Sequence, residues 1–194
     1  MQHDISLAGH AFGLRPVHSS DVGFVAALRA DPTLNRYIHA GDGRVEDQLR
    51  WMYAYFERTG DYYFVVTSQR TGEPEGLISI YDIDGATSAG EWGRWILRPG
   101  SLAAVESVWL LYRVCFETLD LAAVYCRTVA DNTKVVSFHD SCGITRRREL
   151  PLHFHLQDQY LDAIEHRVER LDWPALSGKL EGIAQLTARR VNRA

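Results

Sequence analysis

The sequence predicts one α+β domain, in which helices cover both faces of a mixed, mostly antiparallel, twisted sheet of about seven strands. The chain has 194 residues, of which 46% are apolar and 24% are charged, and these values are typical of one soluble domain. Short β-forming runs alternate with amphipathic helical patterns. No linker, repeat or low-complexity tract divides the sequence, so we expect one core.

The first half of the chain predicts a strand, two helices and a three-strand meander. Phe12 to Val17 has the pattern of a strand, and the polar residues 18–21 can cap a helix that begins near Val22. Apolar residues from Val45 to Phe56 recur at helical spacing and predict a second helix. Strong β-formers separated by turn residues predict antiparallel strands at 62–66, 77–81 and 92–97, the last with a bulge at Gly93.

The second half predicts a long helix followed by alternating strands and helices. Ser101 can cap a helix whose apolar positions continue to Leu119 at the i, i+3, i+4 spacing. With the strands at 92–97 and 122–129, this helix forms a right-handed crossover unit. The remaining predictions are a helix at 132–142 ended by Gly143, strands at 145–156 and 160–171, and a helix from Pro174. We expect residues 1–173 to form the domain and residues 174–194 a helical extension of it.

Charge and cysteine content argue against several classes of protein. Lys+Arg 21 and Asp+Glu 25 give a formal net charge of −4 without a long basic run, so we expect no nucleic-acid partner. No apolar run reaches the roughly 18 residues of a membrane span, and we expect no membrane partner. Cys115, Cys126 and Cys142 form no CxxC pair and are expected to be buried, reduced thiols. A cytoplasmic protein is the simplest interpretation, and its terminal helix could pack on its own domain or on a second subunit of a homodimer.

Two segments could carry chemistry. The strand at 92–97 leads into a helix start whose small residues would let a phosphate approach the amides; they are Gly100, Ser101, Leu102, Ala103 and Ala104. A plain capped turn is the alternative, because the segment matches neither the P-loop nor the GxGxxG pattern. Asn132 and His139 lie about two helical turns apart on one side of the next helix. The His could give or take a proton near neutral pH, or could simply bond to Asp140.

Other polar residues give only weak indications of a binding site. His153 and His155 share a face of a predicted strand, but no third ligand stands at metal-site spacing, so we expect no metal. The run from Arg146 to Arg148 could attract a nucleotide phosphate, although such a run is usually a solvated face.

These residues resemble the GCN5-related N-acetyltransferase (GNAT) superfamily from about Leu14 to Trp173. The opening Leu14-Arg15-Pro16-Val17 is similar to the start of its RimJ/RimL-like and nucleotide-amino-sugar members. Asn132, Phe138-His139 and Gly143-Ile144 resemble the family's Asn, Leu-Tyr and Gly-Phe signature. The strand Ile78 to Asp84, followed by Glu91-Trp92-Gly93, looks most like the PseH-like amino-sugar branch.

The resemblance implies the GNAT fold and direct transfer of acetyl from acetyl-CoA to a primary amine in a ternary complex. It implies that the strands at 92–97 and 122–129 splay apart, so that Trp95, Ile96 and Leu97 pair with the pantetheine arm. It also implies that the pyrophosphate rests on the amides from Gly100 to Ala104 and that Asn132 faces the pantetheine.

Two positions depart from the family pattern. Of the loop positions that are usually small, Gly100 and Ala104 are small but Leu102 is not. His139 replaces the Tyr thought to protonate the departing thiolate. As an imidazolium, His139 could donate that proton.

The resemblance also suggests how the acceptor amine is handled. Glu91 could relay its proton through water, or could be a solvated strand-end carboxylate. The residues expected to contact the acceptor are Arg36, Tyr37, Tyr81, Asp82 and Trp92. A nucleotide-linked amino sugar is the expected acceptor, which basic residues around Arg36 and Arg146 would favour. The alternatives are an aminoglycoside, favoured by an acidic cleft, a protein N-terminus, or a binding protein with a degenerate CoA site.

Overall fold

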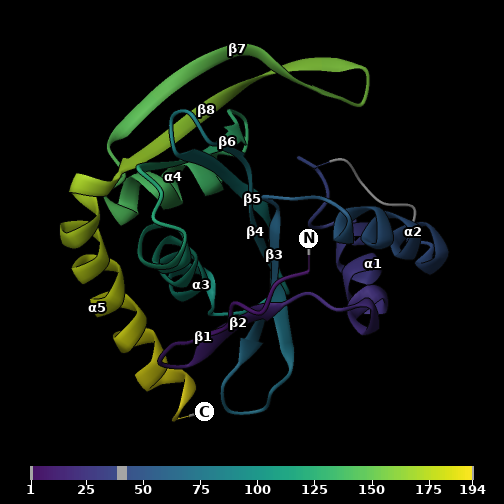
Figure 1. Ribbon diagram of the computed structural model, residues 1–194, viewed down its shortest axis with the longest axis horizontal. Helices are drawn as coiled ribbons and strands as arrows, with labels where there is room; N and C mark the ends of the chain where they lie inside the picture. Colours follow the sequence, from purple (N-terminus) through teal and green to yellow (C-terminus); the bar gives the residue numbers. More distant parts are fainter. Residues whose placement is uncertain (1, 39–42, 194) are drawn as a thin grey trace.

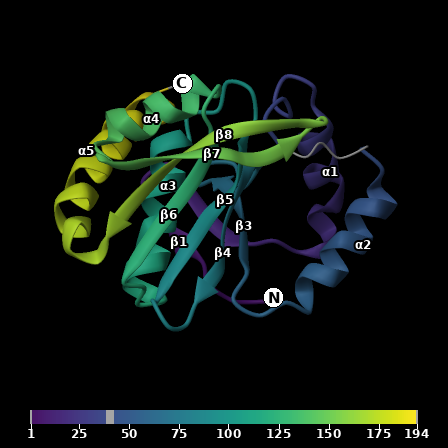
Figure 2. The same cartoon turned by 90° about the horizontal axis from the view of Figure 1, so that it is seen from above.

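The computed structural model describes residues 2–38 and 43–193, and its helices and strands follow the expected order (Figures 1 and 2). The helices are α1 (Val22–Ala30), α2 (Val45–Phe56), α3 (Ala104–Arg113), α4 (Thr133–Cys142) and α5 (Trp173–Val191). The strands are β1 (Leu7–Ala8), β2 (Phe12–Pro16), β3 (Tyr62–Ser68), β4 (Pro74–Asp84), β5 (Ala89–Leu97), β6 (Ala123–Val129), β7 (Arg146–Leu156) and β8 (Gln159–Glu169).

The strands form one mixed sheet in the order β1-β2-β3-β4-β5-β6-β8-β7. Its neighbouring strands are antiparallel except for the pair β5 and β6, which the crossover helix α3 joins in parallel. The expected α+β fold is therefore confirmed. The sheet has eight strands rather than about seven because β1, only two residues long, adds an edge to β2. A two-residue strand is too short to show an alternating pattern.

Helices cover both faces of this sheet, as the sequence predicts. In Figure 1, α1 and α2 lie on one side of the central strands, and α3 and α5 lie on the other. Alternate side chains of β3 supply both cores: Tyr63 and Val65 pack under α1 and α2, whereas Phe64 and Val66 join the core around α3.

The expected bulge interrupts this alternation in β5. Ser79 and Leu77 of β4 lie opposite Gly93 and Ile96, so β5 carries one residue more than its partner over this stretch. Trp92 consequently faces the α3 core, while Ile96, four residues later, faces α1 and α2. Arg94, inside the bulge, has a φ of 47°.

Beyond the start of β5, the parallel pair β5 and β6 separates. Backbone pairing includes Ala89, Gly90 and Glu91 of β5 and stops at the pair of Glu91 with Tyr125. The rest of β6, from Cys126 to Val129, pairs with β8 alone. The β5 edge from Trp92 to Leu97 is thus unpaired on the β6 side, in agreement with the expected splay.

The start of α3 differs from its predicted position, while α4 and α5 begin within one residue of theirs. α3 begins at Ala104 rather than after Ser101, and Ala103 occupies its N-cap position. The Ser101 hydroxyl instead accepts a hydrogen bond from the Ala103 amide within the turn (3.3 Å). α3 then continues into a π-helical segment, Val114–Thr118. The expected end of α4 at Gly143 is confirmed, since this residue adopts a left-handed conformation.

The C-terminal helix α5 packs against the same domain. The Trp109 indole N–H of α3 donates to the Ser177 hydroxyl of α5 (3.2 Å). Leu180 and Ala184 of α5 are fully buried. All three cysteines are buried free thiols, as expected. None of the helices in the described part of the chain combines the length and apolar character needed to cross a membrane.

Replacing Gly143 with Ala tests the end of α4. The φ of 93° at this position is unfavourable for any side chain, and the new methyl group would lie 2.9 Å from the Lys179 amine. We expect Gly143→Ala to lower the free energy of unfolding by about 1 kcal/mol in urea denaturation. The matched control is Gly178→Ala on the exposed face of α5, where a methyl group meets nothing within 4 Å. That change should raise stability, so equal losses in both variants would contradict this explanation.

Candidate active site

A cavity of about 580 Å³ lies on the α1 and α2 side of the sheet, beside the point where β5 and β6 separate. Its wall includes Glu91 and Gly93 of β5, Arg127 of β6 and Phe154 of β7. Trp51 of α2 lines it from the helical side. The cavity therefore joins both helices of this face to the splayed strands.

Arginine dominates the charge of this cavity. Among the described residues, two acidic residues, Asp47 and Glu91, line it. The described arginines that line it are Arg29, Arg44, Arg58, Arg94 and Arg127. Asp61 and Glu165 pair with Arg94 and Arg127 from outside this lining, so five arginines stand against four carboxylates, an excess of one positive charge among these residues. An excess of positive charge favours an anionic ligand over a cationic one.

Glu91 lies at the vertex of the splay and is the carboxylate best placed to accept a proton. It is 9% exposed and lines the cavity. Burial raises the pKa of its carboxyl above the usual value, although the Arg127 guanidinium, 2.8 Å from Glu91 Oε2, opposes the shift. The Tyr81 hydroxyl donates to Glu91 Oε1 at 3.4 Å. A carboxylate with a raised pKa is a better general base than an exposed one.

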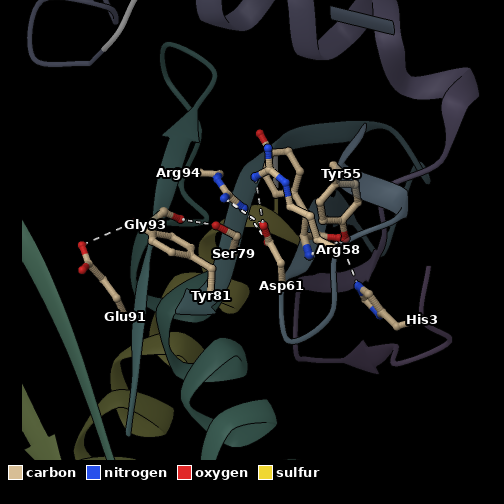
Figure 3. A network of polar contacts seen from close by, with 10 residues as sticks. His3, Tyr55, Arg58, Asp61, Ser79, Tyr81, Glu91, Gly93 and Arg94 are labelled. Carbon is tan, nitrogen blue, oxygen red and sulfur yellow. Dashed lines mark hydrogen bonds and ion pairs between the residues drawn. The ribbon is translucent and has the colours of Figure 1, made fainter. Parts of the chain in front are cut away.

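Gly93 allows Tyr81 to approach this carboxylate. A Cβ atom at position 93 would lie 2.6 Å from the Tyr81 hydroxyl oxygen and would displace it. The Ser79 hydroxyl donates to the Gly93 carbonyl (3.1 Å), as Figure 3 shows. Because the 93–94 peptide is trans, its N–H, on Arg94, points away from Ser79. In the bulge, the Arg94 N–H therefore points away from β4.

On the opposite side of the sheet, aromatic rings border the splayed edge. Trp95 of β5 packs against Phe138 of α4, with ring centroids 5.0 Å apart, and its indole donates to Ser107. Trp92 is 2% exposed and donates to the Tyr112 hydroxyl (3.1 Å). The Trp92 side chain, expected to contact the acceptor, thus faces the α3 core and is not among the residues that line the cavity.

His139 lies behind this aromatic group. It is 1% exposed, its Nε2 is 3.6 Å from Cys126 Sγ, and its ring is 5.4 Å from that of Trp92. Burial, with a smaller effect of His166, lowers the pKa of His139 to about 3. Desolvation thus opposes the imidazolium form through which His139 could donate a proton.

Neither α3 nor α4 has a side-chain cap at its N-terminus, although the Ser101 and Ala103 amides before α3 donate within the turn. Leu102 is 52% exposed, so it does not fill the space beside the α3 N-terminus. Ala103 supplies no side-chain cap to α3, and Asn132 makes no capping hydrogen bond to α4. Helix N-termini in this state present free N–H groups.

The predicted acceptor residues divide between the cavity and its surroundings. Tyr37 and Tyr81 line the cavity, and the Tyr37 hydroxyl also donates to the Asp131 carbonyl (3.1 Å). Arg36 is exposed and stacks on Tyr37 instead of lining the cavity. Asp82 lines a neighbouring cavity on the far side of Tyr81 and Arg94.

The structure also places together residues that the sequence analysis missed. Arg146, expected near a nucleotide, pairs with Asp172 at the α5 end of the sheet. The basic residues of the cavity come instead from α1, the segment before α2, the segment after it, β5 and β6. No local spacing connects them, so only the tertiary fold could reveal this group.

Known proteins resemble this chain in sequence and in fold. The family profile described as Acetyltransferase (GNAT) domain matches residues 12–145. No protein with a curated function matches the chain. FdhC, a solved structure described as a nucleotide-linked sugar GNAT, is 27% identical, with a TM-score of 0.74 over 89% of this chain and 94% of its own. Spermidine N-acetyltransferase from Vibrio cholerae, in complex with CoA and spermine, is 18% identical, with a TM-score of 0.76 over 84% of this chain and 98% of its own. The second likeness is one of fold alone.

The neutral state of His139 predicts how stability depends on pH. The unfolded chain binds a proton at this residue below about pH 6.5, whereas the folded chain does not until about pH 3, so acidification favours unfolding. His139→Phe removes this titration. We expect the stability lost between pH 7 and pH 5, measured by urea denaturation, to be smaller in the variant by up to about 2 kcal/mol. Identical losses in both proteins would show that His139 is protonated in the fold.

Proposed function

The chain belongs to the GNAT acetyltransferase family, and from this premise we propose that it acetylates the primary amine of a nucleotide-linked amino sugar. The donor is acetyl-CoA, and the amine attacks directly in a ternary complex. The arginine-lined cavity beside Glu91 is the observation that carries the proposal.

The charge of the cavity supports an anionic acceptor. Guanidinium groups bind phosphate through paired N–H donors, and the half-buried Trp51 adds a flat aromatic surface on which a base or sugar can pack. A polyamine or an aminoglycoside is cationic and would meet an excess of arginine. The 27% identity to a nucleotide-linked sugar GNAT adds support for the same class.

The opposite side of the sheet fits acetyl-CoA. The unpaired β5 edge, which includes Trp95, Ile96 and Leu97, can hydrogen-bond to the amide groups of a pantetheine arm. The amides of Gly100, Leu102 and Ala104 at the α3 N-terminus suit a diphosphate, whereas those of Ser101 and Ala103 donate to the Arg98 carbonyl and the Ser101 hydroxyl. Asn132, half-buried at the start of α4, would face the pantetheine.

The residues near the point where β5 and β6 separate can then be assigned chemical roles. Glu91 accepts the proton of the attacking amine through a water molecule. The Arg94 amide donates to the acyl oxygen, where negative charge develops, because preorganised N–H groups stabilise such charge. His139 stays neutral and is buried behind Trp92 and Trp95, so it does not supply an imidazolium proton, and the departing thiolate takes its proton from solvent.

An acceptor screen tests the proposed function. The purified chain is incubated with acetyl-CoA and a panel of amines, and free thiol is measured as CoA is released. We expect turnover with nucleotide-linked amino sugars at least tenfold above that with spermidine or aminoglycosides, because the arginines favour the nucleotide phosphates. Added sodium chloride should raise the acceptor KM, since screening weakens this attraction. Preference for a polycationic amine would overturn the assignment of the acceptor.

Replacing Glu91 with Gln tests the assigned base. We expect kcat to fall by about 100-fold, the usual scale for loss of a positioned proton acceptor, with little change in acetyl-CoA affinity measured by calorimetry. The matched control is Glu165→Gln, because Glu165 contacts the same Arg127 (3.0 Å) from behind the cavity wall. Its effect should be much smaller. Equal losses in the two variants would mean that Glu91 acts only by holding Arg127.

A further inference from the structure

The bulge of β5 holds a side chain in an unusual backbone conformation. Arg94 has a φ of 47°, which lies in the left-handed region that residues with a Cβ rarely adopt. Such a conformation persists where the surrounding structure fixes it. The contacts of Arg94 therefore show what maintains the bulge.

One carboxylate, Asp61, holds the Arg94 side chain. Arg94 Nη1 donates to Asp61 Oδ1 at 2.5 Å, and Nη2 donates to Asp61 Oδ2 at 3.0 Å. This two-point geometry fixes the orientation of the guanidinium plane. Asp61 is 5% exposed and directly precedes β3. A second arginine, Arg58, approaches the same carboxylate, with its Nη1 3.6 Å from Asp61 Oδ2.

The same guanidinium packs on aromatic rings that lead to the vertex. It lies 4.4 Å from the centre of the Tyr81 ring and 5.5 Å from that of Trp51. The Tyr81 hydroxyl in turn donates to Glu91. Figure 3 shows this continuous path from Asp61 through Arg94 and Tyr81 to Glu91.

We propose that Asp61 and Arg94 are a positioning pair for acyl transfer. By fixing the guanidinium, Asp61 holds the bulged peptide at 93–94 and keeps the Tyr81 hydroxyl on Glu91. This inference rests on the proposed function, because it assigns the bulge amide and Glu91 to the reacting groups. Asp61 itself lines the neighbouring cavity and not the acceptor cavity, so its effect must pass through Arg94.

A purely stabilising ion pair is the competing explanation, and a second pair in the chain provides the matched control. Arg15 and Asp21 form the same two-point contact (2.8 and 2.7 Å), and Asp21 is 9% exposed. Neither residue lines the acceptor cavity or the cavity beside it. Asp21→Asn therefore removes a comparable charge from a comparable pair that is remote from the vertex.

The experiment compares Asp61→Asn with Asp21→Asn in the full chain. We expect Asp61→Asn to lower kcat at least tenfold while the acceptor KM and the acetyl-CoA Kd change less than threefold. Asp21→Asn should keep kcat within twofold of the parent, even if its melting temperature falls as much. Equal kcat values in Asp61→Asn and the parent chain, or equal losses in both variants, would overturn the proposal.

Hydrogen exchange gives a readout that does not depend on the acceptor. Peptides that cover β5 should exchange faster in Asp61→Asn than in the parent chain and should be unchanged in Asp21→Asn. Arg94→Gly is the second variant, because glycine accepts a φ of 47° without strain while lacking the guanidinium. Slow exchange of β5 in both Asp61→Asn and Arg94→Gly would overturn the proposal. If the parent chain acetylated no amine, the proposed function would fail, and the exchange data would still decide whether the pair holds the bulge.

Discussion

The extra residue in β5 is the constraint on which both sides of the site depend. Without it, Trp92 and Ile96 would face the same side of the sheet, as residues four apart in a regular strand do. With it, Trp95 turns to the α3 and α4 side, while Gly93 and Arg94 stay beside the cavity. The unpaired β5 edge and the arginine-lined cavity therefore meet across one strand, at the residue pair where β5 leaves β6.

The arginines of the cavity are compatible with folding because most of their charge is locally balanced. Arg94 pairs with Asp61, and Arg127 bridges Glu91 and Glu165. A buried charge without a partner would cost several kcal/mol, whereas a paired one contributes a small net free energy of either sign. These pairs therefore serve the geometry of the cavity more than the stability of the chain, and they leave a surplus of positive charge toward the ligand.

The sequence predicted the order of elements well because each has a strong local pattern. The alternation of β3 and the stop at Gly143 follow from neighbouring residues alone. The sequence was uninformative where tertiary structure determines which way a side chain faces and how deeply it is buried. A local pattern does not say which face of a strand meets a cavity, so the sequence could not show that the Trp92 side chain lies in the α3 core. Burial is not visible in sequence either, so the lowered pKa of His139 could not be foreseen. The arginine group was missed because its members come from separate elements.

The short contact between β5 and β6 has a mechanical consequence. Three residue pairs and the α3 crossover join the strands β1 to β5 to the strands β6, β8 and β7. Apart from the two-residue edge strand β1, backbone pairing in the sheet is therefore shortest between β5 and β6, where the two groups of strands meet. A ligand that hydrogen-bonds to the free edge of β5 and also contacts β6 would link the two groups of strands. Its binding would then make local unfolding of the two groups more cooperative.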